Sequence, residues 1–223
     1  MKSVWIIANW KANKNIEEAL EWISVVGPQI PKQENLKVIV CPNFVSLEQM
    51  AKETKVGNYN LLVGSQDLSA FGIGAYTGEV PGALLSDLVF LSIIGHSERR
   101  KNFNETDEIV ARKVKNAFEA NITPLVCVQG EETIVPENCK LVAYEPVWAI
   151  GTGYSDTPEN ANEVAKNLKL KTNLEVLYGG SVNSQNVKGF IRQENINGVL
   201  VGGASLDATE FVNIVKECVV ETS

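Results

Sequence analysis

Three side chains suited to chemistry each follow an apolar run of the sequence. Glu145 could serve as a base, His96 as an electrophile, and Lys11, two residues after Asn9, as a cation. Taken singly, each has a plainer interpretation: a lone histidine is often structural, an acid at a strand end is often a paired charge, and a loop lysine is usually solvated. The chemical interpretation gains weight only if one fold brings the three groups together.

Two glycine clusters form a second set of candidates. Glycine permits close backbone approach and leaves N–H groups free to point at an anion, so both clusters are candidate phosphate sites. The alternative is that these glycines only allow tight turns. Neither cluster has the GxGxxG or GxxxxGK[ST] spacing, which makes a dinucleotide or nucleoside triphosphate a weak prediction. The clusters are Gly179, Gly180 and Ser181, and Gly202, Gly203 and Ser205.

The elements that must position these residues alternate from end to end of the chain. Short β-branched runs alternate with amphipathic stretches, and several runs are continuously apolar, as parallel strands covered on both faces are. The predicted strands are Val4–Ala8, Val38–Cys41, Leu61–Gly64, Val89–Ile94, Thr123–Val128, Leu141–Tyr144, Val176–Tyr178 and Gly198–Val201. The predicted helices include Ile16–Val26, Thr106–Ala120, Pro158–Leu168 and Ala208–Val219.

Eight such units in 223 residues predict an α/β fold with a closed (β/α)8 barrel; a doubly wound open sheet is the competing architecture. In a barrel, the residues that follow the strands gather at one end, which would unite the candidates above. Gln129–Cys139 breaks the pattern, because 11 residues containing Pro136 barely hold a crossover helix. The helix between strands five and six is therefore predicted to be reduced or missing. No linker or repeat is visible, and residues 1–223 are expected to form one domain.

Composition excludes several classes of protein. Hydrophobic residues make up 44% and charged residues 21%, as in globular proteins. The formal net charge of −7 disfavours nucleic acid as a partner. Four scattered cysteines without a CxxC pair are expected to be reduced, and with a single histidine no metal site is predicted. No apolar run is long enough to span a membrane and no cleavage site follows the first residues, so a cytoplasmic protein is expected.

Several motifs of the sequence resemble those of the triosephosphate isomerase family. They occur in the family's order from residue 9 to residue 206, and the ten-residue match around Glu145 is highly specific. The motifs are Asn9-Trp10-Lys11, Gly74-Ala75-Tyr76-Thr77-Gly78-Glu79, Gly95-His96-Ser97-Glu98-Arg99-Arg100, Tyr144-Glu145-Pro146-Val147-Trp148-Ala149-Ile150-Gly151-Thr152-Gly153, Tyr178-Gly179-Gly180-Ser181 and Gly202-Gly203-Ala204-Ser205-Leu206.

The resemblance implies a single TIM barrel that interconverts dihydroxyacetone phosphate and D-glyceraldehyde 3-phosphate through an enediolate, without a cofactor. Glu145 would be the base and His96 the neutral electrophile, while Lys11 and Asn9 would hold the developing oxyanion. The resemblance further implies a phosphate site on Gly151, Ser181, Gly202 and Gly203, and a lid over 146–153. Glu98 would support Lys11. Thr77 would insert beside a neighbouring subunit, which favours a homodimer.

The sequence also departs from the family pattern. Most of one helix is missing between His96 and Glu145, Gln129 is additional, Tyr154-Ser155-Asp156 follows the lid, and Pro81-Gly82 follows Glu79. The missing helix is expected to expose an apolar surface; a tetramer, in which a second dimer covers that surface, is therefore the alternative to the homodimer. Two other functions stay open at this point: a phosphate-binding barrel without turnover, and a metal-assisted sugar-phosphate epimerase, for which one histidine provides few ligands.

Overall fold

The structure is a computed structural model that describes residues 2–149, 155–171 and 173–219. Eight strands form a closed barrel in chain order, and every neighbouring pair is parallel. The barrel was predicted from the alternation of apolar runs and is confirmed. The strands are β1 (Val4–Asn9), β2 (Leu36–Cys41), β3 (Leu62–Ser65), β4 (Leu91–Ile94), β5 (Thr123–Val128), β6 (Leu141–Tyr144), β7 (Glu175–Tyr178) and β8 (Gly198–Val201).

All eight predicted strands are present, with small shifts at their ends. β4 begins at Leu91 rather than at the predicted Val89, although the backbone N–H of Phe90 already donates to the carbonyl of Val63 in the neighbouring strand. β3 is displaced by one residue, from Leu61–Gly64 to Leu62–Ser65. Strand ends of this kind depend on backbone pairing more than on side-chain pattern, which explains shifts of one or two residues.

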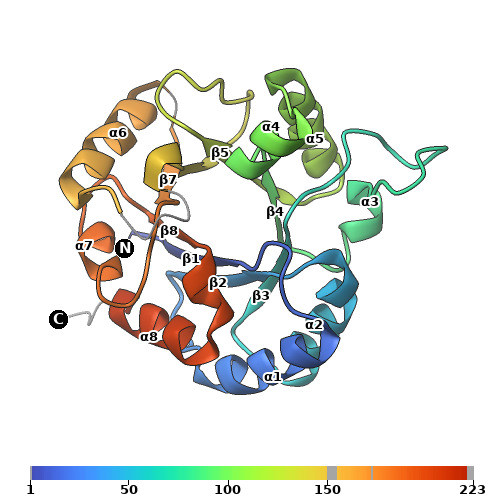
Figure 1. The fold of residues 1–223 in the computed structure, drawn as a ribbon, viewed down its shortest axis with the longest axis horizontal. Helices are drawn as coiled ribbons and strands as arrows, with labels where there is room; N and C mark the ends of the chain where they lie inside the picture. Colours follow the sequence, from blue (N-terminus) through green and yellow to red (C-terminus); the bar gives the residue numbers. More distant parts are fainter. Residues whose placement is uncertain (1, 150–154, 172, 220–223) are drawn as a thin grey trace.

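A ring of helices surrounds the barrel (Figure 1). The helices are α1 (Ile16–Val26), α2 (Phe44–Val56), α3 (Gly82–Leu85), α4 (Ser97–Phe103), α5 (Asp107–Glu119), α6 (Pro158–Lys171), α7 (Val187–Ile191) and α8 (Ala208–Cys218), with 3₁₀ turns η1 (Gly27–Gln29), η2 (Val147–Ala149) and η3 (Gly203–Leu206). Polar side chains fix several starts: Asn15 and Glu18 form a capping box on α1, and the Thr106 hydroxyl accepts from the N–H of Ile109 on α5.

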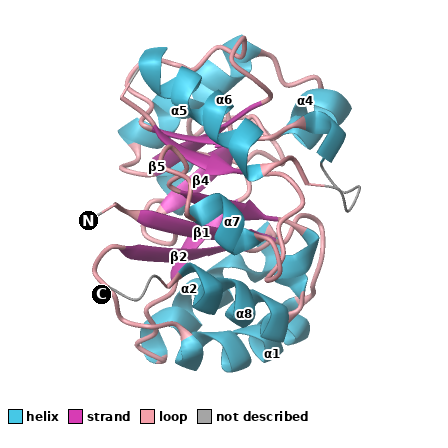
Figure 2. Cartoon of the chain, turned by 90° about the vertical axis from the view of Figure 1, so that its left-hand side faces the viewer, coloured by secondary structure: helices cyan, strands magenta, loops and turns pink. Residues whose placement is uncertain are grey.

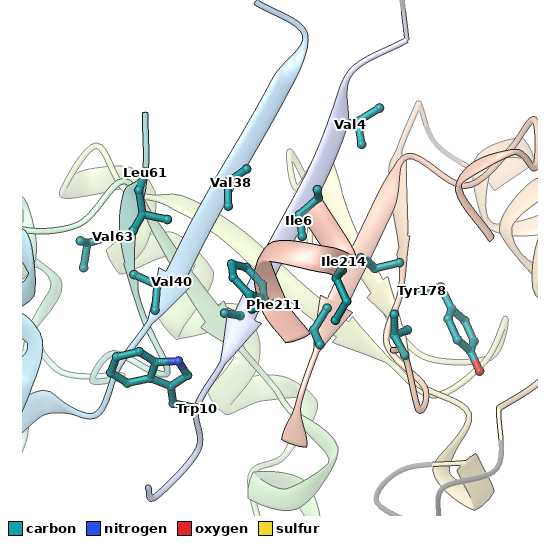
Figure 3. Close-up of a cluster of buried hydrophobic side chains, with 14 of the residues drawn as sticks. Val4, Ile6, Trp10, Val38, Val40, Leu61, Val63, Tyr178, Phe211 and Ile214 are labelled. Carbon is teal, nitrogen blue, oxygen red and sulfur yellow. The ribbon is translucent and has the colours of Figure 1, made fainter. Parts of the chain in front are cut away.

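The apolar side chains are divided between two layers. Those on the inward faces of the strands, such as Ile7, Ile39 and Leu177, fill the interior of the barrel. Those on the outward faces pack against the helices, as Figure 3 shows for Ile6 of β1 and Phe211 of α8. Because both faces of each strand are buried, the strands are continuously apolar in sequence. All four cysteines are free, as expected, and all four are buried.

The connection from β5 to β6 has no helix, as the sequence predicted. Residues 129–140 form turns and extended chain, and Figure 1 shows this segment as a loop between α5 and α6 in the outer ring. Ile134 in the loop and Leu170 on the adjacent helix are 64% and 77% exposed. Apolar side chains thus lie on the surface where the outer ring lacks a helix. Within the described residues, no helix is both long and apolar enough to cross a membrane.

Candidate active site

One cavity at the carboxyl end of the barrel collects most of the predicted site residues. Its volume is about 300 Å³, and its lining includes Asn9, Lys11, His96, Glu145, Ser181, Gly202 and Gly203. Asn9 is the last residue of β1, and the others follow β1, β4, β6, β7 and β8, so five different strands contribute to the cavity. Figure 2 shows the N-terminus at the amino end of the strands, which is the end opposite to this cavity. The barrel therefore brings together groups that lie up to 194 positions apart in the sequence, from Asn9 to Gly203.

Glu145 lies directly after β6 and is 1% exposed. Its Oε2 accepts a hydrogen bond of 3.0 Å from the backbone N–H of Ser97. Its Oε1 lies 2.9 Å from Nε2 of His96, yet outside hydrogen-bond geometry, so no described residue donates a hydrogen bond to this buried oxygen. One carboxylate oxygen is thus anchored, while the other keeps a lone pair available for a proton.

His96 is held by the turn that starts α4. It is the N-cap of the helix, and its Nδ1 accepts from the backbone N–H of Glu98 at 3.2 Å. An acceptor at Nδ1 leaves the ring proton on Nε2, which is the nitrogen near Glu145. Burial opposes protonation of the ring, but the carboxylates of Glu145 and Glu98 outweigh it and raise the pKa of His96. The backbone thus selects the tautomer with its proton on Nε2, and the two carboxylates favour the doubly protonated, positively charged ring.

Lys11 adopts a backbone conformation that is unusual for its residue type. Its φ is 54°, in the left-handed region, which costs a residue other than glycine roughly 1–2 kcal/mol. Its N–H donates to Oδ1 of Asn9 at 3.1 Å, and its Nζ lies 2.5 Å from Oε1 of Glu98. Glu98 thus lies beside Lys11, where the resemblance placed it. The ammonium group forms part of the cavity wall.

The two glycine clusters form the other wall of the cavity. The backbone N–H groups of Ser181, Gly202 and Gly203 donate to no described residue, so they are available to an anion. Gly180 must be glycine, because a Cβ there would lie 2.1 Å from the hydroxyl of Tyr178. That hydroxyl accepts a 2.7 Å hydrogen bond from the backbone N–H of Asp156. The interpretation of the glycines as mere turns is therefore incomplete.

Two other predicted site residues are not part of the described lining of this cavity. Thr77 belongs to the exposed segment 71–79, which extends outward between β3 and α3 (Figure 1). Gly151 lies outside the described residues. Of the predicted lid, 146–153, the structure describes only 146–149. The carbonyl of Ala149 accepts a 2.7 Å hydrogen bond from the hydroxyl of Ser181.

Comparisons with known proteins agree with this geometry. The family model described as triosephosphate isomerase matches residues 4–218. The chain belongs to the triosephosphate isomerase family. A triosephosphate isomerase from Clostridium botulinum (strain Okra / Type B1) is 40% identical over 251 aligned positions, which cover 97% of this chain and 100% of the relative. A triosephosphate isomerase from Endomicrobium trichonymphae is 37% identical, and the alignment covers 97% of this chain and 99% of that relative.

A solved structure supports the same assignment. The crystal structure of triosephosphate isomerase from Bartonella henselae matches with a TM-score of 0.83 and 28% identity, covering 96% of this chain and 98% of that one. This chain is therefore an enzyme of the isomerase class with the TIM-barrel fold. Both sequence alignments are longer than its 223 residues, so the relatives contain segments that have no counterpart here.

Some residues of this isomerase site were missed in the sequence. Ser97 belongs to the motif around His96, but nothing in the sequence indicated that its N–H would donate to Glu145. Cys127 is buried beside this carboxylate; burial and the charge of Glu145 raise the pKa of its thiol well above the usual value. Val182 and Asn183 also line the cavity, without a signal in their types or spacing. Among the described residues no group of three His, Cys, Asp or Glu side chains could hold a metal ion.

Proposed function

We propose that this isomerase interconverts dihydroxyacetone phosphate and D-glyceraldehyde 3-phosphate, with residues 1–223 acting as one catalytic domain. The observation that carries the proposal is the cavity itself, where a buried carboxylate and an imidazole 2.9 Å apart face an ammonium group and backbone N–H groups that donate to no described residue. Such a site can bind a phosphate at one end and exchange a carbon-bound proton at the other.

In the proposed mechanism Glu145 removes a proton from the carbon beside the substrate carbonyl. The carbonyl oxygen becomes an enediolate oxygen, which accepts hydrogen bonds from Nε2 of His96 and from the Asn9 side chain. Lys11 balances the negative charge of the enediolate and of the phosphate. The proton of the neighbouring hydroxyl moves to the former carbonyl oxygen by way of Nε2 of His96, and Glu145 returns its proton to the former carbonyl carbon, so no atom is gained or lost in the cycle.

The phosphate in this proposal lies on the backbone N–H groups of Ser181, Gly202, Gly203 and Gly151. The first three donate to no described residue, which supports the assignment. Fixed N–H groups attract an anion without the rotamer entropy that a long cationic side chain loses on binding. Glu98 supports Lys11 through the 2.5 Å contact with its Nζ.

A coupled assay with glyceraldehyde 3-phosphate tests the function. We expect turnover without added metal or cofactor. A barrel that only binds phosphate would give phosphate binding and no turnover. A metal-assisted epimerase would act on a sugar phosphate only after metal is added, and either result would refute the proposal.

We also propose that the chain is a homodimer in which Thr77 enters the partner. A second cavity of about 290 Å³ lies beside the first, and its lining includes Lys11, Glu98 and Asp67. Phe103, which also lines it, is 66% exposed, and the whole of segment 71–79 is exposed. A polar loop tip inserted there would bury both surfaces.

Thr77→Glu tests the homodimer, because the added carboxylate would meet those of Asp67 and Glu98 in the partner. We expect the mass in solution to fall to that of one chain, whereas Thr209→Glu on α8 should leave it unchanged. A mass of four chains for the unmodified protein would support a second dimer over Ile134 and Leu170. A single-chain mass for the unmodified protein would refute both assemblies.

A further inference from the structure

Gln66, the residue directly after β3, makes two hydrogen bonds to neighbouring strand ends. Its Nε2 donates to the carbonyl of Lys11 at 2.8 Å and to the carbonyl of Cys41 at 3.0 Å. Both partners are acceptors only, so the nitrogen and not the oxygen of the amide must face them. The orientation of this side chain is therefore fixed, and both of its N–H donors are used.

The first bond acts on the strained residue of the site. Lys11 has a φ of 54°, and its own N–H and Nζ are held by Asn9 and Glu98. The amide of Gln66 holds the carbonyl, which is the remaining polar group of Lys11. A lysine in the left-handed region keeps that conformation only where its surroundings determine it. Gln66 supplies the contact on the carboxyl side of the residue.

The second hydrogen bond of Gln66 connects the loop of Lys11 to the end of β2. The carbonyl of Cys41 at the end of β2 also accepts from the backbone N–H of Trp10, at 3.2 Å. Trp10 is fully buried, and β1 and β2 pair in register as far as Asn9 and Cys41. The amide thus joins the loop that carries Lys11 to the last rung of the barrel.

We propose that Gln66 is a positioning residue for Lys11. Gln66 does not line the first cavity, so it acts on the substrate only through the place that it gives the Lys11 ammonium group. The inference rests on the proposed function, in which Lys11 balances the charge of the phosphate and of the enediolate. No motif of the sequence pointed to Gln66.

Gln66→Met, which keeps the length of the side chain and removes both donors, tests the proposal. We expect kcat/KM to fall about tenfold, since displacement of a charged group by a fraction of an ångström weakens the transition state it stabilises. Gln33→Met is the matched control: its Nε2 donates to Oδ1 of Asn35 at 2.8 Å in the segment before β2, at the other end of the barrel. If Gln66→Met does not fold, Gln66→Asn replaces it, because the shorter amide cannot reach both carbonyls.

A double-mutant cycle separates positioning from a general loss of stability. Binding of inorganic phosphate is measured for four chains: unmodified, Gln66→Met, Lys11→Met, and both changes together. We expect Gln66→Met to weaken phosphate binding several-fold when Lys11 is present and to have no effect when Lys11 is methionine. Equal weakening in both backgrounds, no weakening in either, or no phosphate binding by the unmodified chain would overturn the proposal. An unmodified chain that binds phosphate without turnover would refute only the proposed function.

Discussion

Shortening the side chain of Glu145 by one methylene is the most direct test of the proposed chemistry. The carboxylate is held by the backbone N–H of Ser97, which donates to Oε2 at 3.0 Å, while Oε1 lies 2.9 Å from Nε2 of His96. Glu145→Asp withdraws it by about 1.5 Å, the length of one C–C bond. Because a misplacement of about 1 Å costs roughly 100-fold, we expect kcat to fall about 100- to 1000-fold. That range corresponds to about 3–4 kcal/mol of activation free energy.

The Michaelis constant should change little in this variant. The N–H groups of Ser181, Gly202 and Gly203 lie on other strand ends and keep their places, so uniform binding of the phosphate is retained. Initial rates with glyceraldehyde 3-phosphate in a coupled assay give both constants. Glu175→Asp, at the start of β7, is the matched control and should behave as the unmodified enzyme. General-base catalysis contributes about 100- to 10,000-fold, so a kcat for Glu145→Asp within a few-fold of the unmodified value would remove Glu145 from the proton transfer.

Two further predictions concern stability. Gly198→Ala places a Cβ 2.1 Å from the carbonyl oxygen of Trp5, so the free energy of unfolding in urea should fall by about 3 kcal/mol. Gly130→Ala, whose Cβ would meet nothing within 4 Å, should have little effect, and equal midpoints for the two variants would contradict the argument. Burial raises the pKa of Asp67 to about 6 from 3.8 despite its contact with Lys113, so the folded form binds this proton more tightly and about 3 kcal/mol of stability is lost as the pH rises from about 3 to about 7. Urea unfolding should show the stability of the unmodified chain falling relative to Asp67→Asn over that range; a constant or rising difference would refute the assignment.

The barrel could be predicted because its signal is repeated along the chain. Each strand has both faces buried, which leaves a continuous apolar run such as Leu141–Tyr144, and eight runs at regular intervals leave few architectures. The missing helix was also predictable, since a count of residues limits what 129–139 can form. Strand ends were less accurate, because pairing of Phe90 with its neighbours depends on backbone geometry that no side chain records.

The candidate site was predictable where the chemistry depends on residue type. A general base requires a titratable side chain such as that of Glu145, and the single histidine, His96, is conspicuous at a strand end once the strands are placed. Contacts made through the backbone could not be predicted from residue types, because the N–H of Ser97 that donates to Glu145 could belong to any residue except proline. The role of Gln66 could not be predicted for a related reason: its amide donates to two backbone carbonyl groups, which every residue has.

The junction between β8 and β1 has a consequence for how the protein is made. Trp5 pairs with Gly198, so the first strand emerges from the ribosome long before its second neighbour is synthesised. At about 5–20 residues per second, the interval is roughly 10–40 s. During that time one edge of β1 has unpaired backbone donors and acceptors, which another nascent copy could occupy. The edge of β1 is covered only once β8 has been made, so the interval of exposure to aggregation ends with synthesis of β8.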